Sequence, residues 1–182
     1  MAQASALFAG HTDTRVLVRV VGRGTFQNGR ALRAFSLEMI GQGCRQFYVD
    51  LAECHGMDST FLGVLAGIGL RLGEVGQGGC LSLCNIGGRD RELVQTLGLD
   101  RVLRLEACMP GALQRESAEV ELRELPGWEP RAQAAGEAAA LVLHAHDDLC
   151  RVDRGNEERF RDVIRLLRES TAGRGGRTRE GH

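Results

Sequence analysis

A short apolar strand followed closely by a long apolar helix constrains this fold more than any other feature. Residues 46–51 read QFYVDL, a near-continuous apolar run that is typical of a strand covered on both faces. After a turn, residues 59–73 form a predicted helix with almost no polar face. Such a helix must be covered on nearly all sides. The pair therefore predicts an α/β layer around a buried strand.

Further strands and helices alternate around this pair. In chain order, the predicted elements are a strand at 15–21, a helix at 29–40, the strand at 46–51, the helix at 59–73, a strand at 80–86, a short helix within 87–99 and a strand at 101–105. Asn28 is the predicted N-cap of the first helix. Alternation of this kind is typical of an α/β domain with its sheet covered by helices, here spanning residues 13–108.

The C-terminal part of the chain differs in composition. Residues 109–130 contain all three prolines and are predicted to be a linker or a wrapping segment. Residues 131–169 predict two amphipathic helices in tandem, the second capped by Asn156. This hairpin must bury its apolar stripes on the domain, within itself or on a partner. Residues 170–182 are rich in glycine and arginine and predict a disordered tail.

Composition excludes several classes of function. The net charge of −1 gives no electrostatic reason to expect nucleic acid or an acidic membrane as a partner. All 23 lysine-plus-arginine side chains are arginine, so the lysine of a Walker phosphate loop or a Schiff base is missing. No apolar run approaches the roughly 20 residues of a membrane helix, and the first residues do not predict a signal peptide. The six irregularly spaced cysteines predict reduced thiols in a cytoplasmic protein without a cofactor.

The start of the helix at 59–73 carries the most interesting polar side chains. Ser59 lies next to backbone N–H groups that have no partner within the helix, at the positive end of the helix dipole. A phosphate is electrostatically favoured there, on the side chain or on a ligand. Asp58 is a good N-cap in its own right, so helix capping is the simpler interpretation of the same residues.

Four glycines make this helix unusual. Gly63, Gly67, Gly69 and Gly73 each cost about 1 kcal/mol relative to alanine inside a helix. Close approach of another backbone is the usual reason for such a pattern. Packing on the sheet or docking of a partner protein would each provide it.

Other candidate sites are weaker. Ser59 does not lie in a G-x-S-x-G elbow and only His55 is near it in sequence, which argues against a serine hydrolase. His144 and His146 would point about 200° apart on a helix, so they cannot share a metal ion and are expected at the surface. The run GRGTFQNG matches no nucleotide-binding spacing and predicts a turn.

Three short motifs lie at characteristic places along the predicted domain. Asp50-Leu51 ends a strand, Asp58-Ser59 opens a helix that continues into Leu62-Gly63-Val64-Leu65, and Gly98-Leu99-Asp100 precedes the last strand. In this order and spacing, residues 13–108 resemble the STAS domain of bacterial anti-sigma factor antagonists. The resemblance implies a mixed sheet of about four to five strands packed with helices, here with a C-terminal helical extension.

The resemblance also implies a function. It implies a non-catalytic regulatory protein in a partner-switching pathway that controls transcription. An anti-sigma factor that is also a serine kinase would phosphorylate Ser59, with Thr60 as the alternative acceptor, and a phosphatase would reset it. The alternative is a STAS accessory subunit that docks on a lipid or anion transporter without phosphorylation. The C-terminal helices are a predicted second contact surface and candidates for self-association.

The partner-binding surface that the resemblance implies lies around the helix start. It comprises Thr25, Asn28, Asp58, Ser59, Thr60, Phe61 and Gly63. Phe61 stands where the family usually has glycine, and it is expected to be exposed or half-exposed beside the docking site. Thr25 stands where many members carry aspartate. Both residues are expected to define the identity of the partner.

Overall fold

The computed structural model describes residues 5–76, 78–111, 113, 115, 120–126 and 134–175. In chain order its elements are β1 (Ala6–His11), β2 (Arg15–Gly24), α1 (Phe26–Gly41), β3 (Gln46–Asp50), β4 (Cys54–Met57), α2 (Ser59–Val75), β5 (Cys80–Cys84), α3 (Gly88–Thr96), the 3-10 helix η1 (Leu99–Arg101), β6 (Arg104–Glu106), β7 (Arg123–Glu124), α5 (Ala134–Val152) and α6 (Gly155–Gly175). The predicted α/β class with a C-terminal helical extension is confirmed.

The sheet is mixed and has seven strands within the described residues. Its order is β6-β5-β3-β2-β1-β7, and β4 pairs with the end of β2. Strands β2, β3, β5 and β6 run parallel, whereas β1 and β7 add an antiparallel edge. The expected number of four to five strands is too low because β1, β4 and β7 are missing from it. Strands as short as β4 and β7 are formed by pairing with a neighbour rather than by their own apolar pattern.

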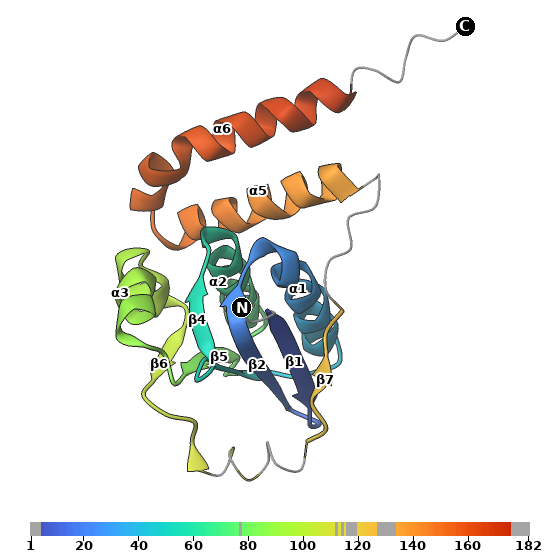
Figure 1. Ribbon diagram of the computed structural model, residues 1–182, viewed down its shortest axis with the longest axis vertical. Helices are drawn as coiled ribbons and strands as arrows, with labels where there is room; N and C mark the ends of the chain where they lie inside the picture. The colour runs from blue at the N-terminus through green and yellow to red at the C-terminus, as the bar shows by residue number, and fades with distance from the viewer. Residues whose placement is uncertain are drawn as a thin grey trace, which may run out of the picture.

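Helices cover one face of the sheet and an irregular segment covers the other. Helices α1 and α2 pack side by side, α5 packs across both, and α6 packs on α5 (Figure 1). On the opposite face Leu17 and Cys84 of the sheet contact Met109 and Leu113. Part of the segment predicted as a linker therefore wraps around the sheet. In β3, Phe47 and Val49 are buried, whereas Gln46, Tyr48 and Asp50 on its other face are half-buried, so the predicted cover on both faces is complete on one face only.

Helix α1 begins three residues earlier than its apolar pattern predicts. Thr25, not Asn28, occupies the N-cap position. Asn28 lies one turn further on, where its Oδ1 accepts the backbone N–H of Thr25 at 2.9 Å. Its Nδ2 donates to the carbonyl of Arg23 at 3.0 Å. Asn28 thus stabilises the entry of α1 by folding back on the preceding turn.

The C-terminal hairpin also differs from prediction at its boundaries. Asn156 is not the N-cap of α6, because the helix begins before it, at Gly155, and its buried amide donates to the carbonyls of Leu97 (3.0 Å) and Leu149 (2.9 Å). Helix α6 continues to Gly175, beyond the predicted boundary at residue 169, since its Ser-Thr-Ala stretch is compatible with a helix. The rest of the predicted tail, 176–182, lies outside the described residues.

Two further sequence expectations concern membranes and thiols. Within the part of the chain that the structure describes, no helix is long and apolar enough to cross a membrane. All six cysteines belong to that part and are free thiols. Cys84 is fully buried in the second face of the sheet, and desolvation raises its pKa to about 11. Buried Cys44 and Cys84 act as small apolar side chains, whereas Cys108 is exposed.

Candidate functional site

Asp58 joins the N-termini of the two long helices. Its Oδ1 accepts the backbone N–H of Phe61 at 2.8 Å and its Oδ2 accepts the backbone N–H of Phe26 at 3.0 Å. The backbone N–H of Asp58 donates to the carbonyl of Gly24 at 2.9 Å, which ties this turn to the end of β2. One carboxylate therefore caps α1 and α2 together and holds the two positive helix ends side by side.

Phe61 is part of the core, and the expectation that it is exposed or half-exposed is wrong. Its exposed fraction is 0%. The ring lies against Gly24, where an added Cβ would approach its Cδ1 to 2.6 Å. Every residue from Thr60 to Ala66 is buried, so a side chain in this first part of α2 has no route to solvent. Thr60 is buried as well, with 6% exposure, which makes it a poor acceptor for a kinase.

The Ser59 hydroxyl contacts a histidine from the C-terminal hairpin. Ser59 Oγ lies 3.2 Å from His146 Nε2, and the two residues are 87 positions apart in the sequence. His146 Nδ1 lies 2.7 Å from the carbonyl oxygen of Val142, which can only accept, so Nδ1 carries the proton of the neutral ring. In that neutral form, Nε2 is the acceptor for the hydroxyl proton of Ser59. His146 is 3% exposed, so the expectation of a surface histidine is wrong for it and right for the exposed His144.

Helix α5 lies directly on the first half of α2. A Cβ built on Gly63 would come within 2.6 Å of the carbonyl carbon of Ala145 and would also contact its oxygen. A Cβ on Gly67 would meet the carboxylate of Asp148, whose pKa is raised by burial. The close backbone approach that the glycines predict is therefore present at Gly63. The backbone that approaches belongs to the chain's own C-terminal helix.

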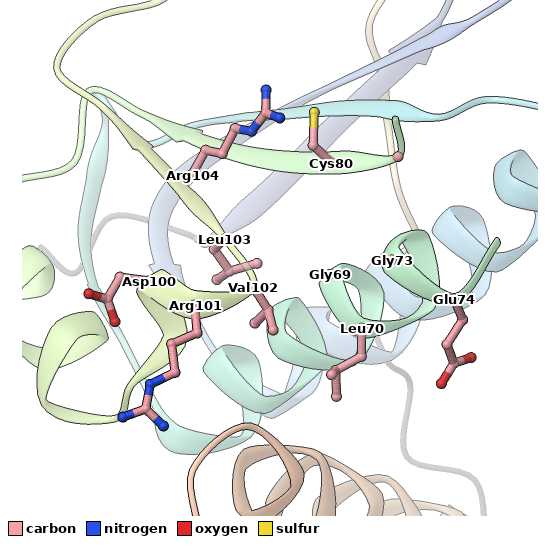
Figure 2. A pocket seen from close by; sticks show the side chains of 11 residues that line it. Gly69, Leu70, Gly73, Glu74, Cys80, Asp100, Arg101, Val102, Leu103 and Arg104 are labelled. Atoms are coloured by element: carbon pink, nitrogen blue, oxygen red, sulfur yellow. The ribbon is translucent and has the colours of Figure 1, made fainter. Parts of the chain in front are cut away.

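The second half of α2 lies away from this contact and borders an open depression. A Cβ on Gly69 would lie 2.9 Å from the carbonyl oxygen of Val102, whereas one on Gly73 would meet nothing within 4 Å. Figure 2 shows the depression, about 550 Å³ in volume, between this end of α2 and the strands β5 and β6. Asp100, Arg101 and Arg104 line it with glycine and apolar groups. It does not include Ser59 or Asp58, so it is not part of the candidate site.

Most of the predicted site residues come together at the junction of α1 and α2. These residues have different structural roles within the chain, and their part in partner binding stays a prediction. Thr25, Asn28 and Asp58 organise the helix starts, Thr60 and Phe61 are buried, and Ser59 and Gly63 face α5. The contact of His146 with Ser59 could not be found from the sequence, where the one signal is the place of His146 beside the apolar side of an alanine-rich helix. No cluster of three or more metal-ligating side chains occurs among the described residues.

Comparison with known proteins supplies a family match. Residues 7–106, more than half of the chain, match a family model described as "Mlab, STAS domain". The match begins inside β1, six residues before the predicted domain start at residue 13. A search of curated proteins gave no match.

Solved structures share this fold at low sequence identity. A protein of Thermotoga maritima proposed to be an anti-sigma factor antagonist has 17% identity and a TM-score of 0.51, with 59% of this chain and 91% of that chain covered. An anti-sigma factor antagonist from Mycobacterium paratuberculosis has 20% identity and a TM-score of 0.51, covering 62% and 93%. The anti-sigma factor antagonist SpoIIAA in its unphosphorylated form has 16% identity and a TM-score of 0.50, covering 63% and 97%.

Proposed function

The chain belongs to the STAS domain family, and from this premise we propose that it is an anti-sigma factor antagonist switched by phosphorylation at Ser59. In this proposal the protein acts in the cytoplasm and catalyses nothing. Its unphosphorylated form binds an anti-sigma factor that is also a serine kinase, and a phosphatase restores that form. The solved anti-sigma factor antagonists with the same fold support this assignment.

One observation carries the proposal: the Ser59 hydroxyl is not needed to cap its helix. Asp58 already supplies the caps of α1 and α2. Ser59 is the first residue of α2, where the unpaired N–H groups and the helix dipole favour an added phosphate. A dianion there would have to be desolvated by any protein that docks on the helix start. Phosphorylation can therefore separate two proteins without refolding either.

Mass spectrometry of the protein purified from its native cells tests the proposal. We expect phosphate on Ser59, its loss in the Ser59→Ala variant, and an anti-sigma kinase that binds Ser59→Ala more tightly than Ser59→Asp. Thr60 is the internal control, because its burial predicts that it stays unmodified. Absence of phosphate at Ser59 under all growth conditions, with equal kinase affinity for both variants, would contradict the switch.

A second candidate function is an accessory subunit that docks on a lipid or anion transporter without phosphorylation. The observation in its favour is the contact between Ser59 and His146, which keeps the hydroxyl half-buried under α5. Co-purification of transporter subunits with protein that carries no phosphate would support it. Neighbouring genes for a kinase or a phosphatase would favour the first function instead.

The pair of Ser59 and His146 also meets one geometric requirement of a serine nucleophile and its base. Ser59 is half-buried and His146 is almost fully buried beneath α5, so a substrate would reach the pair only when α5 moves away. We expect a fluorophosphonate probe to leave the native chain unlabelled. Labelling that disappears in Ser59→Ala would contradict a non-catalytic role.

A further inference from the structure

We propose that the hairpin of α5 and α6 is an intramolecular partner of the α2 face that carries Ser59 and Gly63, and that a phosphate on Ser59 releases it. The inference rests on the proposed function in one respect only, namely that the group added to Ser59 is a phosphate. The occupant of the face is a segment of this chain, which the structure places there. In the unphosphorylated chain, an anti-sigma kinase that binds this face would have to displace α5, so the hairpin and the kinase would compete for it.

The residues of α5 that contact α2 are as deeply buried as the core residues of the domain. Ala145 and Leu149 of α5 are 2% and 0% exposed and belong to the same apolar core as Phe61 and Leu62. The backbone of Ala145 lies on Gly63, where no side chain would fit between the helices. Only a helix with a small residue at this position can approach so closely. The face of α2 is thus shaped to receive a helix, and α5 fills it.

The hairpin is tied together internally. The ring of His146 on α5 makes an edge contact with Phe160 on α6, with 4.8 Å between ring centroids. The buried Asn156 amide donates to the carbonyl of Leu149, and Arg168 of α6 donates to Asp147 of α5 at 3.1 Å. Displacing α5 from α2 therefore displaces α6 with it. The hairpin is expected to move as one unit.

Several of the polar contacts between the hairpin and the rest of the domain are exposed ion pairs. Arg30 pairs with Glu137 at 2.6 Å and Arg151 with Glu74 at 3.0 Å, and all four side chains are about half exposed. Exposed ion pairs of this type contribute little net stability. Besides them, the turn between α5 and α6 is held by the ion pair of Asp153 with Arg101 at 3.0 Å and by Asn156, which donates to the carbonyl of Leu97. The apolar stripe of α5 and the contact of Ser59 with His146 therefore decide whether the hairpin stays docked.

Phosphorylation changes the chemistry of that contact. A kinase transfers the γ-phosphoryl group of a nucleoside triphosphate to Ser59 Oγ: the Oγ–P bond forms, the bond to the diphosphate leaving group breaks, and the hydroxyl proton passes to the kinase. Ser59 then has no proton to donate, and phosphate oxygens face the lone pair of His146 Nε2. The group must also fit where Oγ and Nε2 are now 3.2 Å apart. Both effects oppose docking of α5.

Hydrogen–deuterium exchange of the full chain tests the inference, with phosphoserine installed at position 59 during synthesis. We expect the amides of residues 141–149 to exchange at least about tenfold faster than in the unmodified chain, because local opening sets their exchange. The amides of β3 and β5 should keep their protection, which shows that the domain remains folded. The Ser59→Ala variant loses one hydrogen bond without adding bulk, so its exchange should rise far less.

A second pair of variants tests the docking contact without phosphate. Gly63→Ala places a methyl group against the Ala145 backbone and should reproduce the fast exchange of α5, whereas Gly73→Ala on the same helix meets nothing and should not. Unchanged or slower exchange of 141–149 in the phosphorylated chain would overturn the inference; slower exchange would mean that His146 binds the phosphate. Because the phosphate is installed in the test, this result does not depend on whether native cells phosphorylate Ser59.

Discussion

Removing the carboxylate of Asp58 should destabilise the protein by more than the loss of an ordinary helix cap. An N-cap residue contributes typically about 1 kcal/mol, with a range of about 0.5–2 kcal/mol. Asp58 accepts N–H groups from the starts of both α1 and α2, at 3.0 and 2.8 Å. Asp58→Ala leaves both donors without this partner, so we expect a loss of about 2–4 kcal/mol in the free energy of unfolding.

The isosteric variant Asp58→Asn separates the two caps. Its amide has one accepting oxygen and one NH₂ group, which can only donate. One cap is retained and the other is replaced by two donors facing each other, so we expect a loss of about 1–2 kcal/mol. Asp162→Ala, on an exposed position of α6, is the control and should stay within about 0.5 kcal/mol of the native chain.

Urea denaturation followed by circular dichroism measures these differences, provided that the slope with urea concentration is unchanged among the variants. A typical domain is stable by about 5–15 kcal/mol, so even Asp58→Ala should remain folded enough to measure. The reasoning would be refuted if Asp58→Ala cost no more than a single cap, or if Asp58→Asn were as stable as the native chain. Either result would mean that α1 and α2 do not share their cap.

Three further predictions follow from buried groups. Gly24→Ala should cost about 1–3 kcal/mol in unfolding free energy, because its methyl group would lie against the fixed ring of Phe61. Asn156→Leu should cost about 1–3 kcal/mol, because it removes a buried donor from the carbonyls of Leu97 and Leu149, of which Leu149 keeps the backbone N–H of Asp153; thermal melting would detect the loss. Burial raises the pKa of Cys84 to about 11, so its thiolate fraction at pH 8 is about one in a thousand. Exposed Cys108 should therefore react with iodoacetamide before Cys84, which intact-mass measurements would detect. The native state holds this proton more tightly than the unfolded chain, so the contribution of Cys84 to stability should be lost as pH rises from about 9 to about 11.

The parts of the fold that follow local rules could be predicted from the sequence. The apolar run at 46–51 and the helix that follows it correspond to β3 and α2. Asp58 is an N-cap, as its place before the helix predicts. Capping and apolar periodicity depend on residues within a few positions of one another, so a single sequence contains them.

The edges of the sheet could not be predicted in the same way. Strand β7 has only two residues, and it exists because Arg123 and Glu124 pair with β1. Strand β4 contains a glycine at φ 143° and pairs with the end of β2 across an irregular register. Neither strand has an apolar alternation of its own. Their formation depends on a neighbour brought close by the rest of the fold.

By itself, the sequence determined the order of the four parallel strands β2, β3, β5 and β6 and of the helices between them, the glycine pattern of α2 and the position of Ser59 at its start. It also determined that the C-terminal helices have apolar stripes to bury, because amphipathic periodicity is a property of each helix alone. Only the tertiary structure decided where those stripes are buried. The contact of Ser59 with His146 joins residues 87 positions apart, and the burial of Phe61 depends on how Gly24 meets the helix. Such contacts depend on the packing of whole elements, which no local pattern records.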